Sequence, residues 1–341
     1  MKAFHTICVV LGIALLAFLV WEIGPSRLWG DLSTLGWGLV PLVLIEGVAD
    51  IFHTLGWRHC LSGTHRSISF FRIFRIRLSG YSINYLTPTA SLGGEVTKGT
   101  LLTRDQGAAG AVTGVLIGKL AYTLAQLIFV SLGSIVVLWG IPLPSGLWPA
   151  MLASSALLAI GVFGFLLVQK YGKLGALVRW FVERRLGGNL LQKLAHHITE
   201  VDNELRAFYQ YRPGDLTWAI SWHIVGLACG IVQTWYFLSL LAGHASLAVA
   251  AGIWFLGGWF DFLTFAVPLG IGVQEATRVI ALKAVGYDMA MGLAYGVTLR
   301  LEQIFWALAG LLSYATLISE DSKGKPAPSK VDDRPPALSG P

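Results

Sequence analysis

Residues 88–98 read PTASLGGEVTK, and residues 268–278 repeat the pattern as PLGIGVQEATR. Counted from each proline, a glutamate stands at position +7, a threonine at +9 and a basic residue at +10. A polar residue precedes each proline by four places, Asn84 in the first copy and Thr264 in the second. Proline and glycine interrupt helices, whereas a carboxylate followed three residues later by a cation favours a new helix. Each copy therefore predicts a helix that breaks and restarts.

The composition indicates that these breaks lie in a membrane. Hydrophobic residues make up 55% of the 341 residues, charged residues make up 13%, and the mean hydropathy is +0.64. A soluble protein of this length needs more charge to cover its surface. Inside a bilayer, broken helices are tolerated where protein or a cavity surrounds them, and paired broken helices are typical of secondary transporters. The sequence thus predicts an all-α polytopic membrane protein.

Six apolar segments are long enough to cross a bilayer whose hydrocarbon core is about 30 Å thick. Loop charge sets their direction, because residues 58–77 carry five arginines and no acid. The segment 170–214 is also rich in lysine and arginine, so both segments are expected on the cytoplasmic side. Both chain termini are then cytoplasmic as well. The predicted full spans are residues 4–22, 36–57, 108–140, 147–168, 216–241 and 289–318.

The two broken segments predict two re-entrant helical hairpins, at about residues 78–105 and 260–286. The first hairpin falls in a block over residues 1–140, and the second falls in a block over residues 141–318. Because the loop charges place the first block inside at its start and the second block outside, the two blocks form a predicted inverted repeat. The segment 170–214 is expected to be a cytoplasmic elbow with a solvated face, and residues 319–341 a disordered tail.

The glycines and the embedded cations of the two copies suggest an anion site. Free N–H groups at the start of a helix attract anions, and glycines let a ligand approach the backbone. Lys119 and Arg300 lie on the spans that follow the two copies and supply full positive charge. The predicted substrate-binding residues are Asn84, Pro88, Gly93, Gly94, Glu95, Lys119, Thr264, Pro268, Gly270, Gly272, Glu275 and Arg300.

The two glutamates of the motif have two interpretations. A carboxylate competes with phosphate for a helix N-terminus, so Glu95 and Glu275 are expected to pair with the cations of the spans or to couple protons. The alternative is that they cap their own helices and pair locally with Lys98 and Arg278.

The second predicted span contains three ionisable side chains. Glu46, Asp50 and His53 share one helical face, and charged side chains at mid-membrane cost roughly 2.5–3.5 kcal/mol each on insertion scales. They are expected to face protein or water. Asp50 and His53 have the further alternative of reaching the cytoplasmic interface.

The pattern of residues also carries a family resemblance. Residues Asn84 to Glu95, the later glycine-rich copy that ends in Glu275, and the charge at Arg300 resemble the transmembrane region of lysylphosphatidylglycerol synthetases. The chain is similar to the stand-alone members, including hopanoid-biosynthesis-associated membrane proteins, over nearly its whole length to about residue 318. This resemblance implies a flippase-like fold without the synthetase domain. Lys119 stands where the family has an arginine, and lysine lacks the two-pronged phosphate geometry of arginine.

The expected function is that of a lipid transporter or flippase. It would move the headgroup of an anionic or isoprenoid-type lipid across the bacterial inner membrane between the two hairpins. The alternative is a membrane partner or regulator, without transport, of a lipid-modifying enzyme. The expected partners are therefore a membrane lipid and such an enzyme, and the sequence is compatible with a homo-oligomer.

Several other functions are not expected. No arrangement of serine, histidine and aspartate and no HExxH motif is present, so no catalytic residue and no cofactor are predicted. The three cysteines share no motif spacing, and neighbouring histidines such as His196 and His197 point in different directions, so no metal site is predicted. The net charge is +6, but the basic residues cluster beside apolar segments, where such residues set membrane topology rather than bind nucleic acid.

Overall fold

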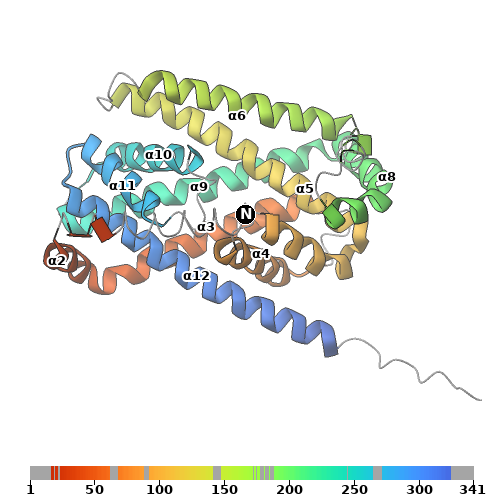
Figure 1. The fold of residues 1–341 in the computed structure, drawn as a ribbon, viewed down its shortest axis with the longest axis horizontal. Helices are drawn as coiled ribbons and strands as arrows, with labels where there is room; N and C mark the ends of the chain where they lie inside the picture. The colour runs from red at the N-terminus through yellow and green to blue at the C-terminus, as the bar shows by residue number, and fades with distance from the viewer. Residues whose placement is uncertain are drawn as a thin grey trace, which may run out of the picture.

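A computed structural model shows an all-helical protein (Figure 1). The structure describes residues 17–18, 20–21, 24–61, 68–87, 92–140, 147–171, 173, 175–176, 180, 184, 188–243, 245–263 and 271–323. Within these ranges the helices are α2 (Pro25–Leu35), η1 (Gly36–Gly38), α3 (Leu39–Cys60), α4 (Phe70–Leu86), α5 (Leu92–Gly140), α6 (Leu147–Lys170), α8 (Gly188–Tyr211), α9 (Pro213–Ala242), α10 (Leu247–Leu263), α11 (Val273–Ala284) and α12 (Met289–Lys323).

Helices α3 and α9 form the centre of the bundle, and small residues let them approach closely. A side chain at Gly56 would meet the backbone oxygen of Ala219 at 2.9 Å, and one at Gly226 would meet the ring of His53. The other helices pack around this pair, with α5 and α10 on one side and α4 and α12 on the other (Figure 1). Helices α2 and α8 lie at opposite ends of the bundle.

Packing between the two halves of the chain is reciprocal. Helix α4, which precedes the first proline–glycine stretch, packs against α12, and α10, which precedes the second, packs against α5. The described residues form three apolar cores, of which two are large. One surrounds α4 and the first part of α5 and includes Ile73, Ile76 and Leu102. The other surrounds α10, α11 and α12 and includes Phe237, Ile253 and Tyr295.

The protein is a multi-pass membrane protein. Among the described residues, the segments that are long and apolar enough to cross a membrane are Pro25–Cys60, Gly107–Ser134, Pro213–Ala242 and Met289–Glu320. Four of the six predicted spans coincide with these segments. The predicted span 147–168 corresponds to helix α6, and its segment Ala159–Val168 is apolar but shorter than the four segments above. The predicted span 4–22 and the tail after residue 323 lie largely outside the described residues.

Helix α5 joins the second part of the first motif to a long span. It runs from Leu92 to Gly140 and changes direction at Gly107, where φ is 72°. A positive φ is readily adopted by glycine and strained for other residues. The restart of a helix after the glycines and a separate span from about residue 108 were both expected, and the bend at Gly107 divides them.

Helix α4 differs from the expectation at its start. The first hairpin was predicted to begin at about residue 78, whereas the structure has one continuous helix from Phe70 to Leu86. The arginines are accommodated because acids on neighbouring helices face them. Arg72 pairs with Asp105 at 3.0 Å, and Arg75 pairs with Glu320 at 2.9 Å.

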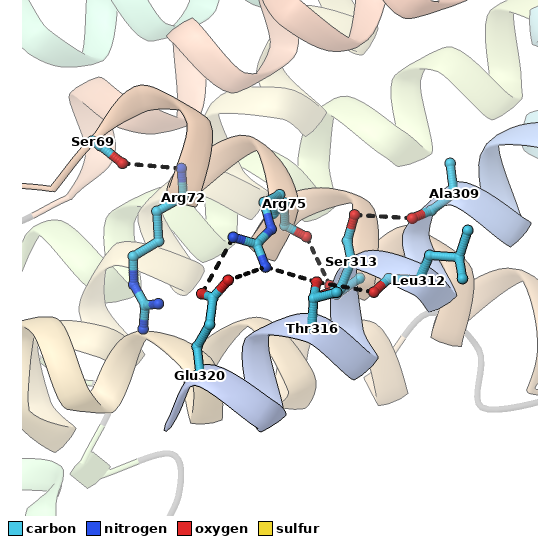
Figure 2. A network of polar contacts seen from close by, with 9 residues as sticks. Ser69, Arg72, Arg75, Ala309, Leu312, Ser313, Thr316 and Glu320 are labelled. Carbon is cyan, nitrogen blue, oxygen red and sulfur yellow. Dashed lines mark hydrogen bonds and ion pairs between the residues drawn. The ribbon is translucent and has the colours of Figure 1, made fainter. Parts of the chain in front are cut away.

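Figure 2 shows how the start of α4 is held. The Ser69 hydroxyl accepts the Arg72 backbone N–H at 3.2 Å, as an N-terminal cap does. The Arg75 guanidinium donates to both Thr316 and Glu320 of α12, at 2.7 and 2.9 Å. These contacts tie α4 to the end of α12.

Helix α8 forms the second half of the segment that was predicted to be a cytoplasmic elbow. Helix α8 has an exposed side that includes Glu200 and Arg206, while Val201, Leu205 and Phe208 are buried in the core that includes α4 and α5. Their spacing places all three on one face of the helix. The described charged residues of α8 are therefore confined to the part of the helix surface that does not face the core.

Gly310 tests the packing of α4 against α12. A Cβ at this position would lie 2.2 Å from the backbone oxygen of Leu78 and 2.9 Å from the Ser82 side chain. We expect Gly310→Ala to lower the stability of the detergent-solubilised protein by about 1–3 kcal/mol, because neither helix backbone can move freely. Thermal unfolding followed by tryptophan fluorescence measures the effect. Gly258→Ala is the control, since a Cβ there meets nothing within 4 Å. Equal Tm values for the two variants would contradict this packing.

Candidate functional site

A polar cavity lies where α3, α4, α5 and α9 meet. Its volume is about 190 Å³. Three cations, Arg77, Lys98 and Lys119, line it together with one carboxylate, Glu95. The other lining residues are Trp57, Tyr81, Asn84, Gly118, Tyr122 and His223.

The first motif builds the wall of this cavity through a close contact between α4 and α5. The Asn84 side-chain oxygen accepts the Gly94 N–H at 2.6 Å, which satisfies a free donor at the start of α5. The contact needs glycine, because a Cβ on Gly94 would lie 2.1 Å from the backbone oxygen of Gly80. Asn84 and Gly94, both predicted to bind substrate, are thus engaged in helix capping and close packing between α4 and α5.

Glu95 faces two lysines. Lys98 Nζ lies 2.6 Å from one carboxylate oxygen of Glu95, and Lys119 Nζ lies 3.9 Å from the other. Lys98 also lies over the Trp57 ring, with its nitrogen 5.4 Å from the ring centroid. The local pair with Lys98 and the longer pair with Lys119, which were alternatives in the sequence, occur together. One carboxylate therefore balances two cations.

The second motif forms a separate cluster outside the cavity. Gly272 has φ of 75° and begins α11, and the Glu275 side chain accepts the Gly272 N–H at 2.8 Å. The other carboxylate oxygen of Glu275 accepts from Arg300 at 2.9 Å. Glu275 is only 1% exposed, so the helix cap and the ion pair together satisfy its buried charge.

One expected local pair is absent from the second motif. Arg278 was the alternative partner of Glu275, but its ion pair is with Asp261 of α10. Arg278 is 2% exposed, and a Cβ on Gly257 of α10 would meet its guanidinium at 2.6 Å. The +10 cations of the two copies therefore differ, because Lys98 pairs within its helix and Arg278 pairs with the preceding helix.

Tyr85 connects the two motifs. It follows Asn84 on α4, and its hydroxyl accepts from the Arg300 guanidinium at 3.4 Å. Arg300 in turn holds Glu275. Of the predicted site residues, Asn84, Glu95 and Lys119 line the cavity, Gly93 and Gly94 lie beside it, and Gly272, Glu275 and Arg300 form the second cluster. Pro88, Thr264, Pro268 and Gly270 lie outside the described residues.

Sequence reasoning missed several residues of the cavity, Arg77 above all. Arg77 pairs with Asp50 of α3, whose side chain is 7% exposed. Asp50 therefore faces protein rather than the interface. The arginine was counted among the topological charges of residues 58–77, and its position seven residues before Asn84, two turns of helix earlier, was the available signal.

Two buried histidines meet at the back of the cavity. The Nδ1 atoms of His53 and His223 lie 3.0 Å apart, and both rings contact the edge of Tyr122. His223 is 3% exposed, and its Nε2 atom has no hydrogen-bond partner among the described residues. His223 lines the cavity, and its Nε2 atom packs against α3, where a Cβ on Gly56 would lie 3.0 Å from it. Among the described residues, no three His, Cys, Asp or Glu side chains gather as a metal site would require.

The comparison with protein families agrees with this architecture. Residues 6–310 match the family described as lysylphosphatidylglycerol synthase TM region. No curated protein and no solved structure matches the chain. The match covers every motif and every cavity residue described above, and the chain therefore belongs to the lysylphosphatidylglycerol synthase transmembrane-region family.

Proposed function

We propose that this protein moves the anionic headgroup of a membrane lipid between the two leaflets, and that the polar cavity is the headgroup site. The observation that carries the proposal is the excess of cations in that cavity. Among the described residues, Arg77, Lys98 and Lys119 face it, whereas Glu95 is the one carboxylate that does. Cations inside a membrane protein are costly and mark substrate pathways.

The chemistry of the lining favours a phosphodiester. Asp50 neutralises Arg77 from behind the cavity, and Glu95 is shared between the two lysines. This leaves the site with roughly one positive charge beyond its carboxylates, which a monoanionic phosphate ester balances. In a low-dielectric site such charge-assisted contacts are stronger than in water. The volume of about 190 Å³ is many times the roughly 10–15 Å³ that one water needs, and it leaves room for a compact headgroup.

The movement we propose uses the two broken segments as re-entrant hairpins. The pair α4–α5 belongs to the first repeat, and the pair α10–α11 belongs to the second. Their reciprocal packing, α4 on α12 and α10 on α5, is what an inverted repeat produces. Tyr85, Arg300 and Glu275 join the first hairpin to the second and form the contact that changes when one repeat rocks against the other.

The location we propose is the bacterial inner membrane, with the end that carries α8 in the cytoplasm. The arginines at the start of α4 pair with Asp105 and with Glu320 at the end of α12, so the basic surface and the chain's C-terminal helix share one side. The hopanoid association implied by the resemblance stays a prediction.

Lipid movement tests the headgroup site directly. We expect Lys98→Gln and Lys119→Gln each to slow the movement of tail-labelled phosphatidylglycerol in proteoliposomes at least tenfold, because each removes a cation from the cavity. A membrane-impermeant reagent that reports the headgroup's leaflet measures the rate. Arg27→Gln is the control, since Arg27 pairs with Asp288 on the surface, where both side chains are more than half exposed.

Rates equal to the wild type in both lysine variants would remove the headgroup site. Absence of lipid movement in the wild type, with stable capture of a lipid-modifying enzyme, would favour the non-transporting partner instead.

The pair formed by Glu275 and Arg300 gives a second test. We expect Arg300→Ala to destabilise the protein by about 3–5 kcal/mol, because it leaves a buried carboxylate without its cation. Adding Glu275→Gln removes the charge and should restore much of the lost stability. The double variant is then folded but lacks the joint between the hairpins, and we expect it to move lipid much more slowly than wild type. Thermal unfolding and the vesicle assay measure the two effects. Wild-type transport by the folded double variant would contradict the proposed joint.

A further inference from the structure

A second hollow adjoins the polar cavity. It lies between α5 and α6, has a volume of about 360 Å³, and is lined by Leu120, Thr123, Leu157, Gly161, Val162 and Phe165, with Lys119 at its edge. Lys119 belongs to both hollows. Figure 1 shows α6 running alongside α5. We define this second hollow as the α5–α6 groove.

The α5–α6 groove has an apolar lining in contrast to the polar cavity. Apart from Lys119 and Thr123, its side chains carry no polar group, and the Thr123 hydroxyl is already bonded to the Lys119 carbonyl oxygen at 2.8 Å. Leu157 at its edge is 72% exposed, as is expected for a side chain that faces lipid. A groove of this character offers nothing to a headgroup and fits a hydrocarbon chain.

Lys119 stands where the two environments meet. It lies near the middle of the span Gly107–Ser134, and its side chain is 47% exposed. Its amine reaches toward Glu95 and the polar cavity, while its stem borders the groove. A long basic side chain commonly covers apolar surface with its methylene groups and keeps its charge in a polar region. The polar cavity and the apolar groove, which adjoin at Lys119, together match an amphipathic molecule that has an anionic group at one end and a hydrocarbon chain at the other.

We propose that the α5–α6 groove holds an acyl chain of the same lipid whose phosphodiester occupies the polar cavity, so that lipid enters from the bilayer between α5 and α6. This inference rests on the proposed function and names the access route and the second subsite of its substrate. Lys119 marks the junction, and it contacts the phosphate once the headgroup has passed between the helices. The chain remains in an apolar environment throughout.

Two glycines of α6 allow a matched test. A Cβ at Gly161 or at Gly164 meets nothing within 4 Å, so a larger side chain at either position fits without a clash. Only Gly161 lines the α5–α6 groove. Gly161→Trp therefore fills the groove, whereas Gly164→Trp places the same bulk on the same helix outside it.

The probes are short-chain phosphatidylglycerol and its deacylated form, glycerophosphoglycerol, titrated against the purified protein in detergent. We expect Gly161→Trp to weaken binding of the phosphatidylglycerol about tenfold or more. The tryptophan displaces methylene groups of the acyl chain from the groove, and the affinity falls with each methylene that is no longer buried. Binding of glycerophosphoglycerol should be unchanged in this variant. Gly164→Trp should bind both probes as the wild type does, and Lys98→Gln should weaken both.

The outcomes separate the two proposals. If Gly161→Trp binds phosphatidylglycerol as tightly as Gly164→Trp does, the groove holds no acyl chain and this inference is overturned, while the headgroup site stands. If Lys98→Gln binds both probes like the wild type, or the wild type binds neither, the headgroup site fails and the inference falls with it. Gly161→Leu, which adds less bulk, should give a smaller loss in the same direction and guards against misfolding of the tryptophan variant.

Discussion

Every buried cation that the structure describes around the two motifs is balanced by a carboxylate, and this balance sets which helices must touch. Arg77 on α4 needs Asp50 on α3, Arg278 on α11 needs Asp261 on α10, and Arg300 on α12 needs Glu275 on α11. A buried ion pair stabilises a fold little more than a pair of apolar side chains would, but removing only one of its two partners lowers the stability strongly. The pairs therefore act as constraints on packing, and they join segments far apart in the sequence.

The exception to this balance is the cavity. Glu95 lies 2.6 Å from Lys98 and 3.9 Å from Lys119, so a single carboxylate faces two amines. His223 adds a ring nitrogen without a partner among the described residues. Arg77, Arg278 and Arg300 each have a close carboxylate partner, whereas the two lysines at this cavity share Glu95, and this difference is the physical basis of the proposed anion site.

The sequence predicted the broken helices and much of the pairing because these depend on local chemistry. A glutamate at the start of a helix, a lysine three residues later and glycines before them have one favourable arrangement, and Glu95 with Lys98 adopts it. Four predicted spans were equally visible in the hydropathy. His223 could not be found this way, since its role depends on α3 and α9 meeting in space, and the signal for Arg77 was only its helical spacing from Asn84. The partner of Arg278 was missed for the same reason, because Asp261 lies on another helix.

The reciprocal packing explains why two motifs with the same spacing have different surroundings. In the first copy the restarted helix leads through the bend at Gly107 directly into a long span, and Lys98 and Lys119, on either side of that bend, converge on Glu95. In the second copy α11 ends at Ala284 and a new helix carries Arg300, which can turn fully toward Glu275. Complete pairing makes the second copy suited to holding the two halves together. Pairing at the first copy is less complete, because Lys119 lies 3.9 Å from the carboxylate that Lys98 contacts at 2.6 Å.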